Sequence, residues 1–151
     1  MITAKDIQEL REKSGVGVMD CKKALTEAKG DLKKAEHILK KSGAMKALKK
    51  ADRITSQGVI ETYSHGEGRI GVIVEINSET DFVARNPEFK EFCHDIAMQI
   101  ASMNPKDVSE LKKQSFIKDL DMTIDELLTQ NIQKIGENIQ IKRFTRYQLG
   151  E

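Results

Sequence analysis

The sequence predicts an α+β protein, in which an N-terminal three-helix bundle precedes a three-stranded antiparallel sheet packed with helices. Residues 1–43 carry three short apolar runs at helical spacing, which indicates the bundle. Two β-rich runs, GVIETYS and RIGVIVEIN, and a later alternating run indicate the sheet. A length of 151 residues suits one domain or two small ones. We therefore expect a helical domain over 1–43, a lysine-rich connection over 44–57 and an α+β core over 58–151.

Capping and turn residues divide the first segment into three helices. Thr3 can cap the first helix, and the glycines of SGVG at 14–17 separate it from the second. Asp31 can cap the third helix, and Gly43 stands where a glycine commonly ends one. A bundle of this size buries little apolar surface, so its own stability should be modest.

The connection, AMKALKKADRITSQ, either extends the third helix or forms a linker. Lysines gather on both sides of its start, at Lys40, Lys41, Lys46, Lys49 and Lys50. The whole chain is nearly neutral, with 25 Lys and Arg against 24 Asp and Glu. We therefore expect a solvated helix face rather than a nucleic-acid-binding surface.

Turn and capping residues also define the elements of the core. HGEG at 65–68 joins the two β-rich runs as a hairpin, and NIQIKRFTRYQL at 138–149 alternates as a third strand. Asn86 followed by a proline begins a helix, and Thr123 begins another in a capping-box pattern. Residues 106–122 give no clear pattern. The helices should form a layer on one face of the sheet.

Few motifs point to enzyme chemistry. The GxGxxG at 66–71 lies between strands, whereas a dinucleotide-binding loop needs a helix after it, so we interpret it as a hairpin turn. Cys21 and Cys93 form no CxxC, and the three histidines complete no metal-ligand pattern, so we expect no metal. No apolar run is long enough to span a membrane, and the polar start, MITAKDIQEL, does not suit a signal peptide.

The stretch SETDFVARN, residues 78–86, allows two interpretations. Phe82 precedes Phe89 by seven residues, so one continuous helix would bury both rings on one face. Alternatively, the helix begins at Asn86, and Phe82 then projects from the connection beside Asp81. An exposed aromatic on a positioned connection is typical of a binding site.

Two segments resemble the signatures of the bacterial elongation factor Ts family. LREKSGVGVMDCKKAL, at 10–25, is similar to its N-terminal signature, and EINSETDFVARN, at 75–86, to the signature built on TDFVA. KSGAMKALKKA at 41–51 and GENIQIKRF at 136–144 also resemble family sequences. The resemblance thus covers nearly the whole chain. It is to a compact member, with one core half and no helical-hairpin insertion.

The resemblance implies a guanine nucleotide exchange factor for the GTPase elongation factor Tu, which acts by binding and is not an enzyme. It implies a cytoplasmic protein without cofactor, membrane contact or direct contact with nucleic acid. The N-terminal domain would resemble ubiquitin-associated domains and contact the GTPase through Leu10, Arg11, Val16, Val18 and Met19. At least one of these could instead be bundle core. The segment inserted near the Mg²⁺ site of the GTPase would be Thr80, Asp81, Phe82 and Val83.

Other interpretations and the assembly state stay open at this level. The chain could be an adaptor module with a different partner, or a small hydrolase that uses Glu79 and Asp81. A compact member could also complete its binding surface by forming a homodimer through the last strand or the sheet. Some family members carry a cysteine in the last strand, but Arg143 to Arg146 stand there in this chain, so a disulfide cannot form in that strand.

Overall fold

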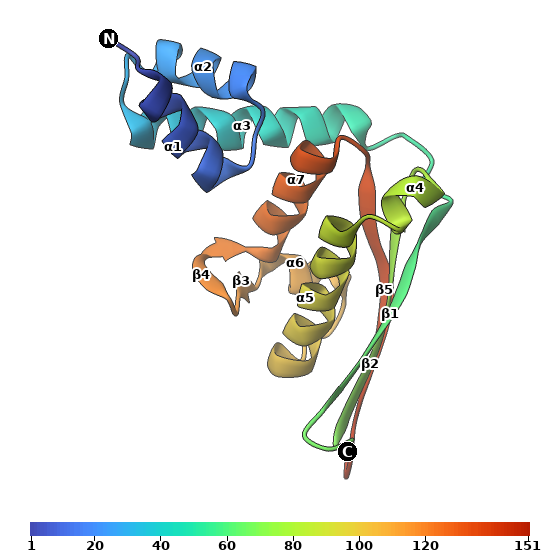
Figure 1. Ribbon diagram of the computed structural model, residues 1–151. Helices are drawn as coiled ribbons and strands as arrows, with labels where there is room; N and C mark the ends of the chain where they lie inside the picture. The colour runs from blue at the N-terminus through green and yellow to red at the C-terminus, as the bar shows by residue number, and fades with distance from the viewer.

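The computed structural model describes residues 1–151 and has the predicted α+β architecture. An N-terminal helical unit leads through a long helix into a sheet with helices on one face (Figure 1). The elements, in order, are α1 (Ala4–Ser14), α2 (Val18–Glu27), α3 (Leu32–Lys50), β1 (Gln57–His65), β2 (Ile70–Ser78), α4 (Asp81–Ala84), α5 (Pro87–Met103), α6 (Val108–Lys113), β3 (Ser115–Phe116), β4 (Asp119–Thr123), α7 (Ile124–Ile135) and β5 (Ile139–Gln148).

The caps predicted for the helical unit are present. Thr3 and Asp6 form a complete capping box, and Gly15, in the left-handed conformation at φ 68°, caps the C-terminus of α1. Asp31 accepts a hydrogen bond from the backbone N–H of Lys34 at the start of α3. The unit has its own apolar core of Leu10, Val16, Cys21, Ala24, Leu25, Ala28, Ala35 and Leu39. The three-helix bundle is thus observed, while its likeness to ubiquitin-associated domains stays a prediction.

The third helix is longer than Gly43 suggested. Gly43 does not end α3, which continues to Lys50, so the interpretation of this glycine as a helix terminus is wrong. Gly43 is buried, and an added Cβ would lie 2.5 Å from Oε1 of Gln133 on α7. The glycine therefore serves a close approach of two helices, and the first half of the connection extends α3 while the rest leads to β1.

The sheet has the strand order β1-β2-β5 and is antiparallel throughout. Gly66, Glu67 and Gly68 all have positive φ in the turn between β1 and β2, so the GxGxxG is confirmed as a hairpin. The pairing of β2 with β5 shifts register between Glu75 and Ile76, which marks a bulge. Since β2 is central, its Val72, Val74 and Ile76 are the strand's buried row.

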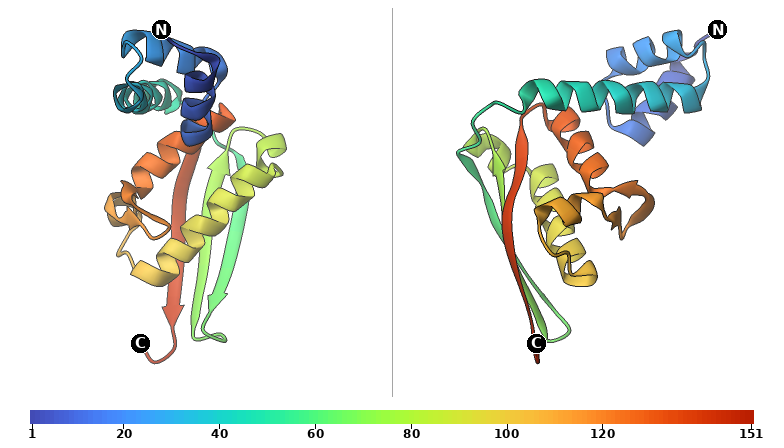
Figure 2. Two further views of the ribbon diagram at one scale, coloured as in Figure 1. Left: turned by 60° about the vertical axis from the view of Figure 1, so that its left-hand side comes forward. Right: turned by 180° about the vertical axis from the view of Figure 1, so that it is seen from behind.

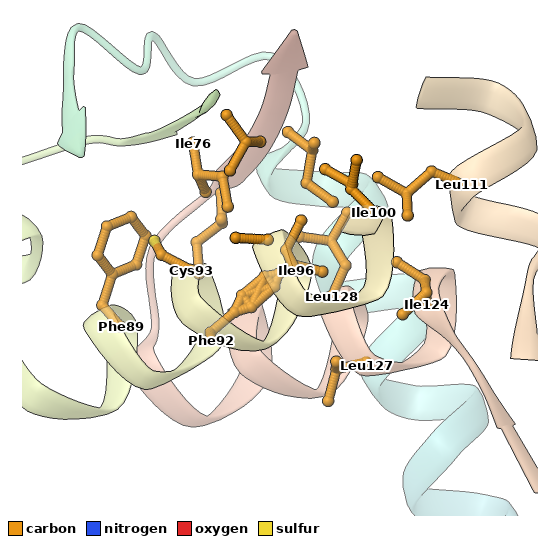
Figure 3. Packing of buried hydrophobic residues seen from close by; sticks show 14 of the residues in the cluster. Ile76, Phe89, Phe92, Cys93, Ile96, Ile100, Leu111, Ile124, Leu127 and Leu128 are labelled. Atoms are coloured by element: carbon orange, nitrogen blue, oxygen red, sulfur yellow. The ribbon is translucent and has the colours of Figure 1, made fainter. Parts of the chain in front are cut away.

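Helices α5 and α7 cover one face of the sheet (Figure 2). Asn86 caps α5 and Pro87 occupies its first turn, and Thr123 accepts from Glu126 N at the start of α7, as predicted. Figure 3 shows the core they form with β2, which includes Ile76, Phe89, Phe92, Cys93, Ile96, Ile100, Leu111, Ile124, Leu127 and Leu128.

The segment without a clear sequence pattern folds as α6 and the short hairpin of β3 and β4. The fully buried Gln99 of α5 holds this hairpin. Its side chain donates to Ser115 O at 3.0 Å and accepts from Ile117 N at 2.9 Å. A buried polar side chain with partners of this kind fixes one arrangement, which periodicity alone does not predict.

No helix in the structure combines the length and apolar character required to cross a membrane.

Candidate functional site

The candidate site is the four-residue helix α4, which follows the end of β2. Thr80 has extended backbone geometry, and its hydroxyl accepts a hydrogen bond from Val83 N at 3.3 Å, so it caps α4. Asn86 then caps α5 separately. The two caps break the chain into two helices between Asp81 and Phe89, and the continuous helix considered above does not form.

Adjacent side chains of α4 differ sharply in exposure. Phe82 is 79% exposed, whereas Val83 is only 6% exposed and belongs to the core cluster. Val83 therefore lies beneath α4 and anchors it, and its part in binding a partner stays a prediction. Phe82 does project into solvent, and its burial beside Phe89 is ruled out. A large aromatic ring exposed on an anchored turn is typical of a binding contact.

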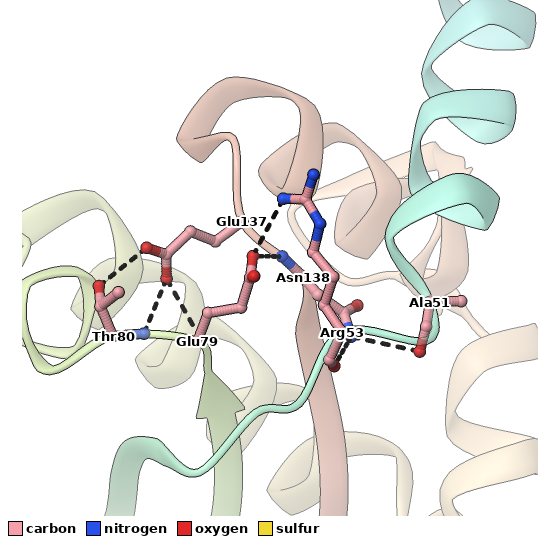
Figure 4. Close-up of polar contacts among 6 residues, drawn as sticks. All are labelled: Ala51, Arg53, Glu79, Thr80, Glu137 and Asn138. Carbon is pink, nitrogen blue, oxygen red and sulfur yellow. Dashed lines mark hydrogen bonds and ion pairs between the residues drawn. The ribbon is translucent and has the colours of Figure 1, made fainter.

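Glu137, in the turn between α7 and β5, holds the base of α4 (Figure 4). One carboxylate oxygen accepts from the backbone N–H groups of Glu79 and Thr80, at 3.2 and 3.1 Å. The other accepts from the Thr80 hydroxyl at 2.8 Å. Hydrogen bonds to an ionised acceptor are among the stronger ones in proteins. The start of α4 is therefore tied to a segment that lies far away in the sequence.

A second set of polar contacts extends this anchor to the end of α3 (Figure 4). Glu79 accepts from Asn138 N at 2.8 Å and lies 3.5 Å from Nη1 of Arg53. The Asn138 side chain donates to the Arg53 carbonyl at 3.0 Å and to the Ala51 carbonyl at 3.5 Å. Asn138 itself is buried. The connections that precede β1, follow β2 and precede β5 are thus joined at one place.

Asp81 is the exposed acidic residue beside Phe82. Its carboxylate accepts from Arg85 Nη2 at 2.6 Å, one helical turn later. The two side chains remain 66% and 74% exposed, and exposed ion pairs contribute at most about 1 kcal/mol. A partner can therefore replace Arg85 at little cost. Glu79, in contrast, is occupied by the anchor, so the two carboxylates have separate partners and form no acid–base pair.

The N-terminal candidates divide into surface and core residues. Val18 and Met19 begin α2 and are 46% and 67% exposed, and Arg11 is exposed on α1. Leu10 and Val16 are buried in the helical unit, at 0% and 4%. They therefore support the surface from below rather than form it. We use the name α2 patch for Arg11, Val18 and Met19.

Three residues of the anchor are absent from the set that sequence reasoning selected: Arg53, Glu137 and Asn138. Glu137 and Asn138 lie in GENIQIKRF, which resembles the family, and that resemblance was the available signal. Their role depends on contacts across 57 to 87 positions, which no local pattern displays.

These features are typical of a protein that binds another protein. An exposed aromatic on a braced turn and a separate exposed apolar patch on a helical unit suit a macromolecular contact. No group of three or more His, Cys, Asp or Glu side chains is arranged to hold a metal ion.

Comparison with known proteins shows the family, and the chain belongs to the elongation factor Ts family. The family model described as "Elongation factor TS" matches residues 79–151. Elongation factor Ts of Carboxydothermus hydrogenoformans is 45% identical over 100% of this chain and 90% of its own length. Elongation factor Ts of Moorella thermoacetica is 39% identical over 100% of this chain and 97% of its own length.

The relatives are longer than this chain, as expected for a compact member. Elongation factor Ts of Alkaliphilus oremlandii is 44% identical over 195 aligned positions, which span 99% of this chain and 90% of the relative. The 195 positions exceed the 151 residues of this chain by 44. These additional residues of the relative lie inside the aligned region.

Proposed function

We propose that the protein is the guanine nucleotide exchange factor of elongation factor Tu in translation elongation. It binds the GTPase in its GDP form, displaces Mg²⁺ at the partner's nucleotide site and promotes GDP release, so that GTP can bind. It acts in the cytoplasm through contacts alone and catalyses no bond change. Membership of the elongation factor Ts family supports this function.

The observation that carries the proposal is the exposed ring of Phe82 on an anchored helix. Phe82 is 79% exposed, while Val83 beneath it is in the core and Thr80 before it is bound by Glu137. A ring held in this way loses little conformational freedom when it enters a partner. We infer that Phe82 inserts near the Mg²⁺ site of the GTPase, with Thr80 and Asp81 beside it.

One ring is not sufficient for exchange. Binding and GDP release are reciprocally coupled, so a factor that weakens GDP binding must itself bind better to the nucleotide-free GTPase. A weakening of about 10⁴ requires about 5.5 kcal/mol of differential binding. Burial of one phenylalanine supplies about 1.5–3 kcal/mol. The remainder must come from loss of Mg²⁺ and from contacts that direct the ring.

The α2 patch is the second contact in this proposal. Met19 and Val18 are large apolar side chains exposed on a helical unit whose core they do not complete. Arg11 of α1 adds an exposed cation on the same helical unit. We propose that this patch docks on the GTPase domain and that Leu10 and Val16 maintain its shape from within.

Stimulated release of labelled GDP from elongation factor Tu tests the function. The exchange factor accelerates release in proportion to its concentration, up to saturation. The alternative function, an adaptor module with a different partner, predicts release at the intrinsic rate.

We also propose a homodimer through the uncovered face of the sheet. Ile60 of β1, Ile73 of β2 and Tyr147 of β5 are 59%, 54% and 78% exposed on the side away from α5 and α7. Register places Ile73 between Thr62 and Thr145, and Gly71 opposite Tyr147. The next row sets Ile60 beside Glu75, which pairs with Arg143, so the charges nearest the centre of this face neutralise each other. A second copy can cover it in a twofold arrangement.

Sedimentation at increasing concentration tests this assembly. We expect a dimer that is unchanged by reductant, because both cysteines are buried. Ile73→Asp should give a folded monomer, and Thr55→Asp, at a half-exposed position before β1, is the charge control. A parent chain that stays monomeric at high concentration would exclude the dimer.

A further inference from the structure

Helix α3 crosses α7 where α3 carries Gly43. Figures 1 and 2 show the C-terminal half of α3 lying across the C-terminal part of α7. A Cβ at Gly43 would lie 2.5 Å from Oε1 and 3.1 Å from Cδ of Gln133. The Gln133 side chain thus fills the space that the glycine leaves. Its Nε2 is buried without a hydrogen-bond partner, so this contact depends on steric fit and not on a hydrogen bond.

A second contact joins α7 to the turn between α1 and α2. The Lys134 side chain lies against Gly15, so closely that a Cβ there would overlap its Cε. Gly15 also has φ 68°, which favours glycine. Nε2 of Gln130 lies 3.5 Å from the Ser14 carbonyl. Because α1 ends at Ser14, its C-terminal partial negative charge favours the nearby lysine.

The three α7 residues form one surface. Gln130, Gln133 and Lys134 are spaced i, i+3 and i+4, so they lie on the same side of the helix. Between the two contacts is a cleft of about 510 Å³, lined by residues of α1, α3, β4 and α7. Ala47, one turn after Gly43, also packs against the main core, so the helical unit is held along the second half of α3 and, separately, at the turn after α1.

Two supports have a mechanical consequence for the exposed residues. Helix α3 has 19 residues and so extends about 28 Å, with the α2 patch on the unit near its first half and α4 beyond its end. A helix of this length held only at one end lets the unit swing. Contact at Gly43 together with contact at Gly15 should restrict that motion.

We infer that α7 braces the helical unit through the Gly15–Lys134 and Gly43–Gln133 contacts and so fixes the position of the α2 patch relative to Phe82. Gln133 and Lys134 are positioning residues that reach no partner themselves. The link to exchange rests on the proposed function, whereas the bracing is a property of the free protein.

Variants that add a side chain at Gly43 and remove the one at Gln133 test whether this contact braces the helical unit. Gly43→Leu adds a side chain that Gln133 obstructs, and Gly43→Leu with Gln133→Ala removes the obstruction at nearly constant volume. Lys41→Leu puts the same residue on the exposed side of α3 and is the control. Gly43→Ala with and without Gln133→Ala repeats the comparison with the smallest addition.

Spin labels report the geometry without the partner. Cysteines introduced at the exposed positions Lys23 on α2 and Lys90 on α5 carry the labels. Cys21 and Cys93 are buried, and burial raises the pKa of the Cys93 thiol to about 12, so the native thiols do not compete. Distances between labels are compared with GDP release for each variant.

We expect Gly43→Leu to shift or broaden the distance distribution and to slow stimulated GDP release about tenfold. The double variant should regain the parental distance and rate, and Lys41→Leu should match the parent. A parental distance in Gly43→Leu, or a shifted distance that Gln133→Ala does not correct, overturns the brace. A shifted label distance in Gly43→Leu together with a parental rate of GDP release would show that the brace has no role in exchange. If the parent chain does not stimulate GDP release from elongation factor Tu, the proposed function is refuted. The label distances still test whether α7 braces the helical unit.

Discussion

Glu137 binds Thr80 twice, through the backbone N–H at 3.1 Å and through the side-chain hydroxyl at 2.8 Å. The same hydroxyl caps α4 by accepting from Val83 N. Thr80 thus joins the turn before β5 to the helix that carries Phe82. This relationship explains how so short a helix can present an exposed aromatic in a fixed direction.

Removing this anchor should affect exchange more than stability. Glu137→Ala leaves the N–H groups of Glu79 and Thr80 without their acceptor, which costs about 1 kcal/mol where water can reach them. Glu137→Gln keeps one acceptor oxygen and should be milder. Urea denaturation measures the stability, and labelled GDP release measures the function. Parental exchange in Glu137→Ala would show that the anchor is not needed.

The α2 patch should contribute to binding and little to folding. Val18→Asp and Met19→Asp place a charge on exposed positions, where the stability change is usually within about 0.5 kcal/mol. Complex formation with elongation factor Tu should weaken markedly, because the charge would be buried in the contact. Calorimetric titration gives the affinity, and thermal unfolding gives the stability. Equal losses of both would assign these residues to the bundle core.

Glu75 should make stability depend on pH in the acidic range. The Asn77 amide at 3.0 Å and the Arg143 guanidinium at 2.9 Å hold the pKa of this carboxyl below 4.5. A lowered folded-state pKa gives stability that is present above pH 4.5 and is lost as the pH falls through the folded value. Arg143→Ala should raise the pKa of Glu75, as measured by NMR titration. Glu75→Gln should weaken the dependence of the free energy of unfolding on pH in this range. An unchanged pH dependence would show that Glu75 is not responsible for it.

The native thiols should be inert in the folded protein. Burial, with the Glu61 carboxylate as a smaller cause, raises the pKa of Cys93 to about 12, and the thiolate is the reactive form. A thiol reagent at neutral pH should therefore react with neither cysteine until denaturant is added. Rapid reaction of one thiol in native conditions would reveal local opening of the core.

Much of the fold follows from local signals. Thr3, Asn86 and Thr123 cap helices as their side chains predict, and the glycines at 66 and 68 form the hairpin turn. The prediction that Gly43 ends the third helix was wrong, because a glycine can also allow a close approach of two helices. Its partner Gln133 lies 90 positions away in the sequence. The hairpin of β3 and β4 depends on buried Gln99, whose contacts likewise have no periodic signature.

The candidate site was predictable in part. Asn86 followed by proline correctly separates Phe82 from the buried stripe of α5, and the ring is exposed. Val83, Leu10 and Val16 match family motifs but are buried, because a motif contains both the residues that touch a partner and those that support them. Glu137 was missed because its role exists only after β2 and β5 have paired.

Phe82 and Phe92 should differ sharply in their contribution to stability. Phe92 is 2% exposed, so Phe92→Ala should lower the free energy of unfolding by about 3–5 kcal/mol. Phe82→Ala should lower it by no more than about 0.5 kcal/mol, since the ring has few neighbours to lose. Denaturant unfolding of the two variants makes the comparison.

The most direct measurement is the rate of GDP release from elongation factor Tu with Phe82→Ala beside the parent chain. We predict that Phe82→Ala keeps the parental fold and strongly reduces stimulated release. Asp81→Ala should reduce release less, since its carboxylate acts through charge and hydrogen bonding rather than through volume. A folded Phe82→Ala variant that stimulates GDP release from elongation factor Tu at the parental rate would contradict the role assigned to this ring.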